Sequence, residues 1–375
     1  MSLTLCAGSA DWIAYQNEGG RWTHLGGAGS WTFKATPRLG VARFVAHPNG
    51  TGSSLHVAYL TAAQAARLFT CPAFPIPPDG MISGSIAGAS DHFYAQVYLN
   101  GMTAYMSQDR SEWTVSAQPV PATLVAVRYD SMGNAMFADR LVVRRDQSYL
   151  PGTFVPLIDF ASEESFAPQV NTASFAGARA SLTVWYISNE RVHLLSSVPP
   201  IDATPQSAPL HSLPAVRLAE GDIHMAHLRM GELRSVDRYF RVGEDVTLSV
   251  GPELATPTLT TVATQPYRRI RVELPSQPQY DASVDVYLAQ NAPASNSSSD
   301  ITLYTTREYF GGTPSVWALE VPDLSSIPGF QLVHAFAEGE FTWYVRATNA
   351  RFDLNHRTAQ DGETALHALR LGRTP

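Results

Sequence analysis

The stretch Thr-Leu-Val-Ala-Val-Arg-Tyr at residues 123–129, followed by Asp-Ser-Met-Gly-Asn at 130–134, decides the fold class. A second run with alternating side chains follows at residues 135–143. Asp, Gly and Asn favour tight turns, and apolar side chains that recur at every second position are typical of β-strands. The sequence therefore predicts an antiparallel hairpin formed by Thr123–Tyr129 and Ala135–Val143.

The same period of two recurs along almost the whole chain of 375 residues. Charged residues make up only 16% of the chain, below the roughly 25% of an average soluble protein, and Lys34 is the single lysine. Helical patterns are confined to Thr61–Phe69, where Thr61 can act as the N-cap, and to Asp361–Leu371. We therefore expect an all-β fold of tandem β-sandwich domains, of the immunoglobulin-like or transthyretin-like kind, with one or two short helices.

Proline-rich stretches mark the expected domain boundaries, because proline fixes φ and lacks a backbone donor. They lie at residues 72–78, 199–209 and 252–257. Four domains follow from these boundaries: an N-terminal β domain (1–73), a β-sandwich (80–160), a β domain (161–257) and a β-sandwich with a C-terminal helix (266–375).

Two of these segments resemble known modules. Residues 82–88 (Ile-Ser-Gly-Ser-Ile-Ala-Gly), Ala95–Leu99, Trp113–Val115 and Ala122–Val127 follow the order of a carboxypeptidase-regulatory-like (transthyretin-like) module of secreted bacterial proteins. Pro121-Ala122 departs from the Gly-Thr pair that is common at its turn. The resemblance covers about a fifth of the chain, carries no catalytic residue, and implies a stalk, spacer or ligand-display role.

The segment from Tyr267 to Ala350 loosely resembles a fibronectin-III-type sandwich, through its 280–288 strand, Trp317 and the 343–347 strand. This likeness concerns architecture and implies no function. The whole chain resembles secreted bacterial proteins built from such modules, which implies no particular activity.

Charge and hydropathy exclude two classes of protein. The net charge of −7 argues against a nucleic-acid partner, because such proteins need a concentrated basic face. No run of about 18 apolar residues is present, so no transmembrane span is expected. No signal peptide is visible at Met1, so either the protein is cytoplasmic or the sequence begins after a removed signal. The β-rich content favours export, and we expect an extracellular, periplasmic or cell-envelope location.

Cys6 and Cys71 are the two cysteines. In an oxidising compartment they could form a disulfide that closes the first domain. A second interpretation is a lipid-anchored Cys6, with Leu3 at a suitable position, although Leu5 stands where a small residue is usual. Two buried free thiols are the third.

A catalytic centre is not predicted, since the chain has no Gly-x-Ser-x-Gly elbow and no His-Glu-x-x-His pair. The strongest metal candidate joins Asp222, His224 and His227. On a helix the two histidines would share a face, but on a strand they point to opposite faces. The residues from Ile223 to Leu228 are more typical of a strand, so we expect two ordinary histidines and no cofactor. Replacing either histidine by Ala should then cost no more stability than a surface substitution does. A metal-dependent hydrolase remains the alternative.

Trp22, Trp12 and Tyr15 are the candidates for ligand binding. Aromatic rings exposed on a sandwich could stack against sugars, whereas core packing is the competing interpretation. Together these observations predict a non-catalytic secreted or envelope protein that presents β-sandwich modules for adhesion, scaffolding or glycan contact. Its expected partner is a glycan or an envelope protein, and the sequence leaves its oligomeric state open.

Overall fold

The structure is a computed structural model. It describes residues 1–6, 10–27, 29–47, 52–69, 80–88, 93–99, 102–106, 111–117, 122–132, 134–150, 152–177, 179–188, 191–201, 206–292, 297–330, 336–352, 354 and 358–374. Strands account for 63% of the residues and helices for 5%. These values confirm the predicted all-β class and the tandem β-sandwich architecture. Within the described residues, no helix is long and apolar enough to cross a membrane.

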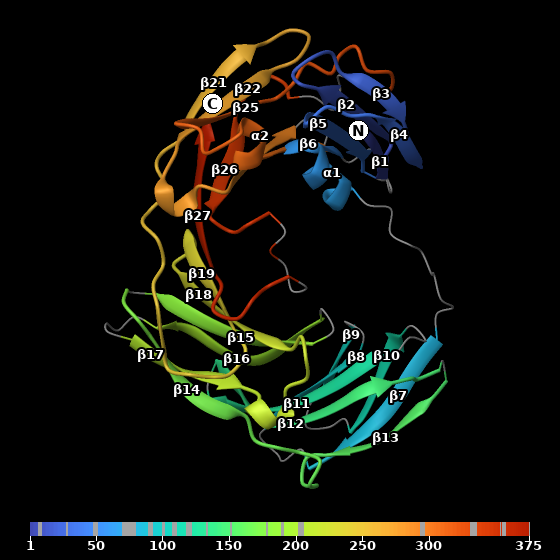
Figure 1. Cartoon of the computed structure of the whole chain (residues 1–375), viewed down its shortest axis with the longest axis vertical. Coiled ribbons are helices and arrows are strands. Elements are labelled where there is room, and N and C mark those ends of the chain that lie inside the picture. Colours follow the sequence, from blue (N-terminus) through green and yellow to red (C-terminus); the bar gives the residue numbers. More distant parts are fainter. Residues whose placement is uncertain are drawn as a thin grey trace. The chain divides into compact units, whose positions relative to one another are not determined.

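The chain forms two compact units. The first unit comprises residues 1–73, 252–352 and 366–375, and the second comprises residues 74–251 and 353–365. Figure 1 shows that each unit consists of strands in layered sheets.

The first unit is built on one long sheet backed by two smaller ones. The long sheet runs in the order β3 (Thr23–Gly26), β2 (Trp12–Asn17), β5 (Arg38–Ala46), β6 (Gly52–Thr61), β24 (Ser297–Thr306), β23 (Ser283–Ala292), β26 (Phe341–Thr348) and β27 (Thr364–Thr374). The smaller sheets are β1 (Ser2–Cys6) with β4 (Ser30–Lys34), and β21 (Thr258–Ala263), β22 (Arg269–Pro275) and β25 (Val316–Glu320). A parallel pairing of β6 with β24, which sets Leu55 opposite Ile301, joins the N-terminal strands to the rest.

The second unit repeats this plan. Its long sheet runs in the order β19 (Arg234–Phe240), β18 (Ile223–Met230), β15 (Ala180–Ser188), β16 (Arg191–Ile201), β12 (Ala135–Gln147), β11 (Ala122–Met132), β8 (Phe93–Leu99) and β9 (Met102–Met106). Its smaller sheets are β10 (Glu112–Ala117), β7 (Gly80–Ala87) and β13 (Phe154–Asp159), and β17 (Gln206–Ser212), β14 (Gln169–Phe175) and β20 (Val246–Leu248).

Alternation of side chains builds the cores between these sheets. On β22, Ile270, Val272 and Leu274 are each 1% exposed and face the core. The residues between them point outward, and Arg271 pairs with Glu273 at 2.8 Å. This pattern buries one face of a sheet and solvates the other, as a sandwich requires.

The predicted hairpin is confirmed: β11 pairs with β12 in antiparallel register, with Val127 opposite Leu141. The first predicted helix is also confirmed. It is α1 (Ala62–Leu68), whose N-terminus has a capping box in which the Thr61 hydroxyl accepts from the Gln64 backbone and the Gln64 side chain accepts from the Thr61 backbone.

The predicted C-terminal helix is wrong. Residues 364–374 form β27, which pairs antiparallel with β26 and sets Ala347 opposite Ala368. The alanines and leucines of this segment favour a helix locally, but burial of Ala368 against the sheet outweighs that weak preference. Among the described residues, the remaining helices are the single turn α2 (Arg307–Phe310) and the 3₁₀ turns η2 (Ala215–Arg217) and η3 (Pro278–Tyr280).

The cores relate to the predicted domains in two ways. One core is drawn only from residues 82–160, within the predicted 80–160 domain. Another combines Tyr129 with Tyr186, and so joins residues from two predicted domains. The division into four domains stays a prediction.

Candidate functional site

The two candidate tryptophans lie in the core of the first unit. Trp12 is 2% exposed and stacks on Phe44 with ring centroids 5.3 Å apart. Trp22 is 9% exposed and belongs to the same core. Tyr15 is half-buried and stacks on Phe33 with centroids 3.9 Å apart. Both indole rings are therefore covered by protein, and neither offers a ring face to a sugar in this structure.

His224 and His227 lie on opposite faces of β18, as the strand interpretation predicts. The Nε2 atom of His224 accepts a hydrogen bond from the backbone of Leu213 at 3.0 Å, and its Nδ1 lies 3.0 Å from the carbonyl oxygen of Arg241. Both ring nitrogens are therefore in use. His227 contacts Asp237 instead, with 2.5 Å between Nδ1 and Oδ1. The two rings cannot share one metal ion in this arrangement.

His224 differs from the expectation of a surface-like residue, because it is fully buried. Its ring belongs to a row of aromatic side chains across neighbouring strands, with Tyr186 at 5.6 Å and Phe240 at 5.1 Å between centroids. Burial lowers the pKa of His224 to about 4. This burial does not fit a surface-like residue, and we expect replacement of His224 to cost more than a surface substitution.

Asp222 completes a buried ion pair rather than a metal site. Its Oδ2 accepts from Arg145 at 2.5 Å, from the hydroxyl of Tyr186 at 2.8 Å and from the backbone of Ala219 at 2.8 Å. Among the described residues, no group of three or more His, Cys, Asp or Glu side chains could hold a metal ion.

Cys6 ends β1 and is disulfide-bonded, and its backbone N–H donates to Phe69 at 3.0 Å. Cys71 lies outside the described residues. The predicted pairing of these two cysteines stays a prediction.

An open face of the long sheet in the first unit gathers polar and aromatic side chains that the sequence interpretation missed. Tyr287 on β23 is directly opposite Tyr344 on β26, and their rings stack with centroids 4.9 Å apart and 16° between planes. Thr302 on β24 flanks Tyr287 on the other side. All three side chains are half-buried, so part of each ring or hydroxyl reaches solvent.

An ion pair borders the stacked rings. Asp285 is opposite Arg346, and its Oδ2 accepts from the Arg346 guanidinium at 2.8 Å. The Oδ1 atom of Asp285 has no hydrogen-bond partner within the described part of the chain. Burial raises the pKa of Asp285, and the charge of Arg346 opposes this effect. We name Asp285, Tyr287, Thr302, Tyr344 and Arg346 the tyrosine face.

The tyrosine face exists because its strands alternate. Val284, Val286 and Leu288 of β23 point into the core, so the residues between them point outward. This alternation is visible in the sequence. The pairing register of two strands more than 50 residues apart is not, so the juxtaposition of Tyr287 with Tyr344 could not be predicted.

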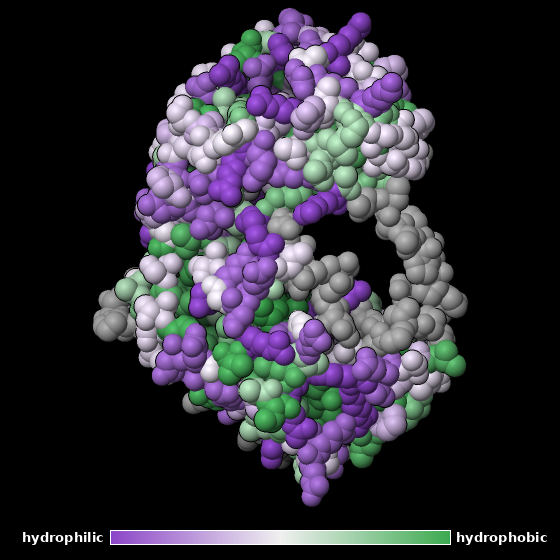
Figure 2. Space-filling view, viewed as in Figure 1, coloured by the Kyte–Doolittle hydropathy of each residue, from purple (hydrophilic) through white to green (hydrophobic). Residues whose placement is uncertain are grey.

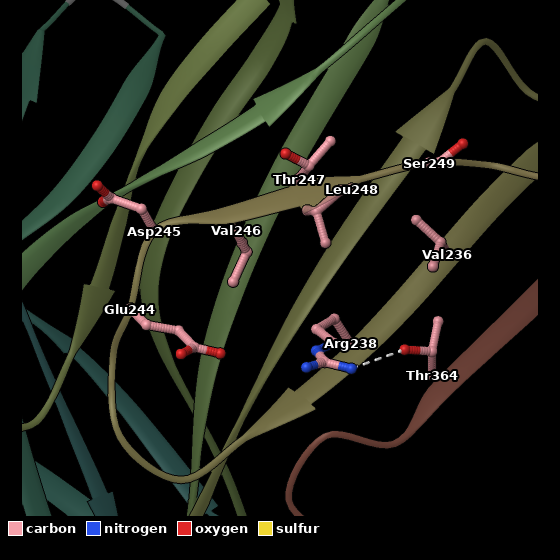
Figure 3. Close-up of a pocket in the computed structure, with 9 residues that line it drawn as sticks. All are labelled: Val236, Arg238, Glu244, Asp245, Val246, Thr247, Leu248, Ser249 and Thr364. Carbon is pink, nitrogen blue, oxygen red and sulfur yellow. Dashed lines mark hydrogen bonds between the residues drawn. The ribbon is translucent and has the colours of Figure 1, made fainter.

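A pocket of about 450 Å³ lies in the second unit, between β19 and β20. Its lining consists of Val236, Arg238, Glu244, Asp245, Val246, Thr247, Leu248, Ser249 and Thr364. Figure 3 shows Glu244, Val246 and Leu248 pointing to the side of β20 where Arg238 lies, with Asp245 and Thr247 pointing to the other side. Arg238 donates to the carbonyl of Gly362 and to the hydroxyl of Thr364, the latter at 3.2 Å.

Comparisons with known proteins add little to this picture. No family model matches the chain, and no curated protein matches it. Among solved structures, the chain aligns with the TIE protein of Bacillus anthracis at 7% identity and a TM-score of 0.17, over 97% of this chain and 65% of that one. The chain thus spans just under two thirds of that protein's length, and the likeness is too low to support an inference.

Proposed function

We propose that this chain is a non-catalytic protein of the cell envelope or the extracellular space, whose β-sandwich units contact a glycan through the tyrosine face. The observation that supports this proposal is the stacked pair of Tyr287 and Tyr344 on an open sheet face, beside the ion pair of Asp285 and Arg346. Aromatic rings pack against the apolar C–H face of a sugar, and charged side chains bond its hydroxyls.

The polar neighbours suit a hydroxyl-rich ligand. Arg346 has 57% of its side chain exposed, so its remaining N–H groups can donate to sugar oxygens. Thr302 adds a hydroxyl that can donate or accept. Figure 2 shows hydrophobic residues interspersed with hydrophilic ones on the face that it displays. The module resembling a transthyretin-like domain would then act as a spacer.

Isothermal titration calorimetry with chito-oligosaccharides, cello-oligosaccharides and soluble peptidoglycan fragments tests the proposal. We expect at least one to bind, and Tyr287→Ala or Tyr344→Ala to weaken binding about tenfold, which equals about 1.4 kcal/mol. Tyr105→Ala is the matched control, because Tyr105 is 74% exposed on β9 of the second unit. The absence of any binding, or an equal loss in the control, would contradict the proposal.

A further inference from the structure

The pocket of the second unit coincides with an unpaired strand edge. The sheet β17-β14-β20 ends at β20, which pairs only with β14 through Val246, Thr247 and Leu248. The other side of an edge strand presents N–H and C=O groups that no neighbouring strand satisfies. No other backbone pairing involves residues 244–250 within the described part of the chain.

The pocket lies against this edge rather than against one face of β20. Successive side chains of a strand point to opposite faces. Every residue from Glu244 to Ser249 lines the pocket, and Figure 3 shows their side chains pointing to both sides. A cavity that touches both faces of a strand must extend along its edge. A ligand in this pocket would therefore reach the backbone of β20.

The side chains of the pocket combine an apolar wall with separate charges. Val236 and Leu248 are 1% and 4% exposed, and they form the apolar part. Arg238 and Glu244 supply the opposite charges in the lining, so each can meet a charge on a ligand. Two bonds fix the Arg238 guanidinium to Gly362 and Thr364, which orients its remaining N–H groups.

We infer that this pocket receives an extended peptide segment of a partner protein, which adds to the edge of β20 as a further strand. Main-chain hydrogen bonds to β20 supply affinity in such strand addition, and pockets for alternate side chains supply specificity. An apolar side chain of the peptide contacts Val246 and Leu248, and an acidic side chain two residues away meets Arg238. The short length of β20 limits unspecific pairing, because short edge strands are poor templates. This inference does not depend on the glycan proposal.

Matched valine-to-lysine substitutions test the inference. Val246→Lys places a charged side chain inside the pocket. Val216→Lys adds the same side chain on η2, where Val216 is 90% exposed and does not line the pocket. Dodecapeptides selected from a random phage-displayed library on the wild-type protein serve as probes. We expect selected peptides to bind Val216→Lys within twofold of the wild-type affinity, and Val246→Lys at least tenfold more weakly.

Two further measurements separate strand addition from other binding. Arg238→Gln should weaken binding of peptides with an acidic residue about fivefold, and it provides a second variant should Val246→Lys fail to fold. Hydrogen exchange should show added protection of β20 amides when peptide is bound. Enrichment of no peptide, equal affinity for Val246→Lys and Val216→Lys, or binding without protection of β20 would each overturn the inference.

Discussion

Mild acid should destabilise the second unit, because three of its histidines are buried in the neutral form. Burial lowers the pKa of His193 to about 3 and that of His211 and His224 to about 4, from an ordinary value of 6.5. An unfolded chain takes up protons at these residues once the pH falls through 6.5, and the folded chain does not until about pH 4. Their contribution to stability is therefore complete above pH 6.5 and is lost as the pH falls toward 4.

The size of the loss follows from these values. At pH 5 each histidine is about 1.5 pH units below its ordinary pKa, which costs about 2 kcal/mol of unfolding free energy. Three such residues together cost about 6 kcal/mol, compared with about 5–15 kcal/mol for the whole stability of a typical domain. We expect the second unit to be close to unfolding at pH 5.

His193 offers the sharpest test of this reasoning. Its ring lies 5.0 Å from that of Tyr98 and 5.5 Å from that of Tyr186, and neither ring nitrogen has a partner among the described residues. The unfolding free energy of the wild type should fall between pH 7.5 and pH 5, and in His193→Leu this decrease should be smaller by about 2 kcal/mol. Tyr98→Phe is the control, because it perturbs the same contact and does not titrate in this range.

Unfolding of the second unit can be followed apart from that of the first through the oxidation of Met225. The protein is treated with peroxide in increasing urea, and mass spectrometry quantifies the oxidised methionine. Met225 is 9% exposed on β18 and becomes reactive only when the strand opens. The reasoning would be refuted if the unfolding free energy of His193→Leu fell between pH 7.5 and pH 5 by an amount within about 0.5 kcal/mol of the wild-type decrease. The expected contribution of about 2 kcal/mol from His193 would then be absent.

Three other substitutions have definite expected outcomes. Asp222→Asn should cost about 3 kcal/mol in urea denaturation, because it removes the buried anion that pairs with the half-buried guanidinium of Arg145, whereas exposed Glu244→Gln should cost under about 0.5 kcal/mol. Cys6→Ser should lower stability by roughly 4 kcal/mol if the loop to Cys71 is closed, and titration of two free thiols in the unreduced, unfolded wild-type protein would contradict that pairing. His224→Ala should cost about 2–4 kcal/mol through a cavity and two lost hydrogen bonds, and a cost below about 0.5 kcal/mol would contradict its burial.

Local features of the fold could be predicted because they depend on neighbouring residues. The hairpin of β11 and β12 needs only two alternating runs and a turn, and α1 needs only Thr61 and Gln64 to cap it. The prediction of a helix in the segment 364–374 was wrong for the opposite reason. Its residues favour a helix when considered alone, and only the pairing with β26, which the sequence does not reveal, makes it a strand.

The candidate sites depend on pairings that connect distant residues, and this explains why the sequence pointed to core tryptophans and did not reveal the tyrosine face. Trp12 and Trp22 stand out because tryptophan is rare and amphipathic, but large rings bury the most apolar area and are drawn into the core. Tyr287 and Tyr344 look ordinary in sequence, each lying between two apolar core residues. Their position opposite one another on an open face arises from the register of β23 with β26, and so does the ion pair of Asp285 with Arg346. A surface that binds a ligand is assembled by register, so the residues to test first are outward-facing side chains on paired strands.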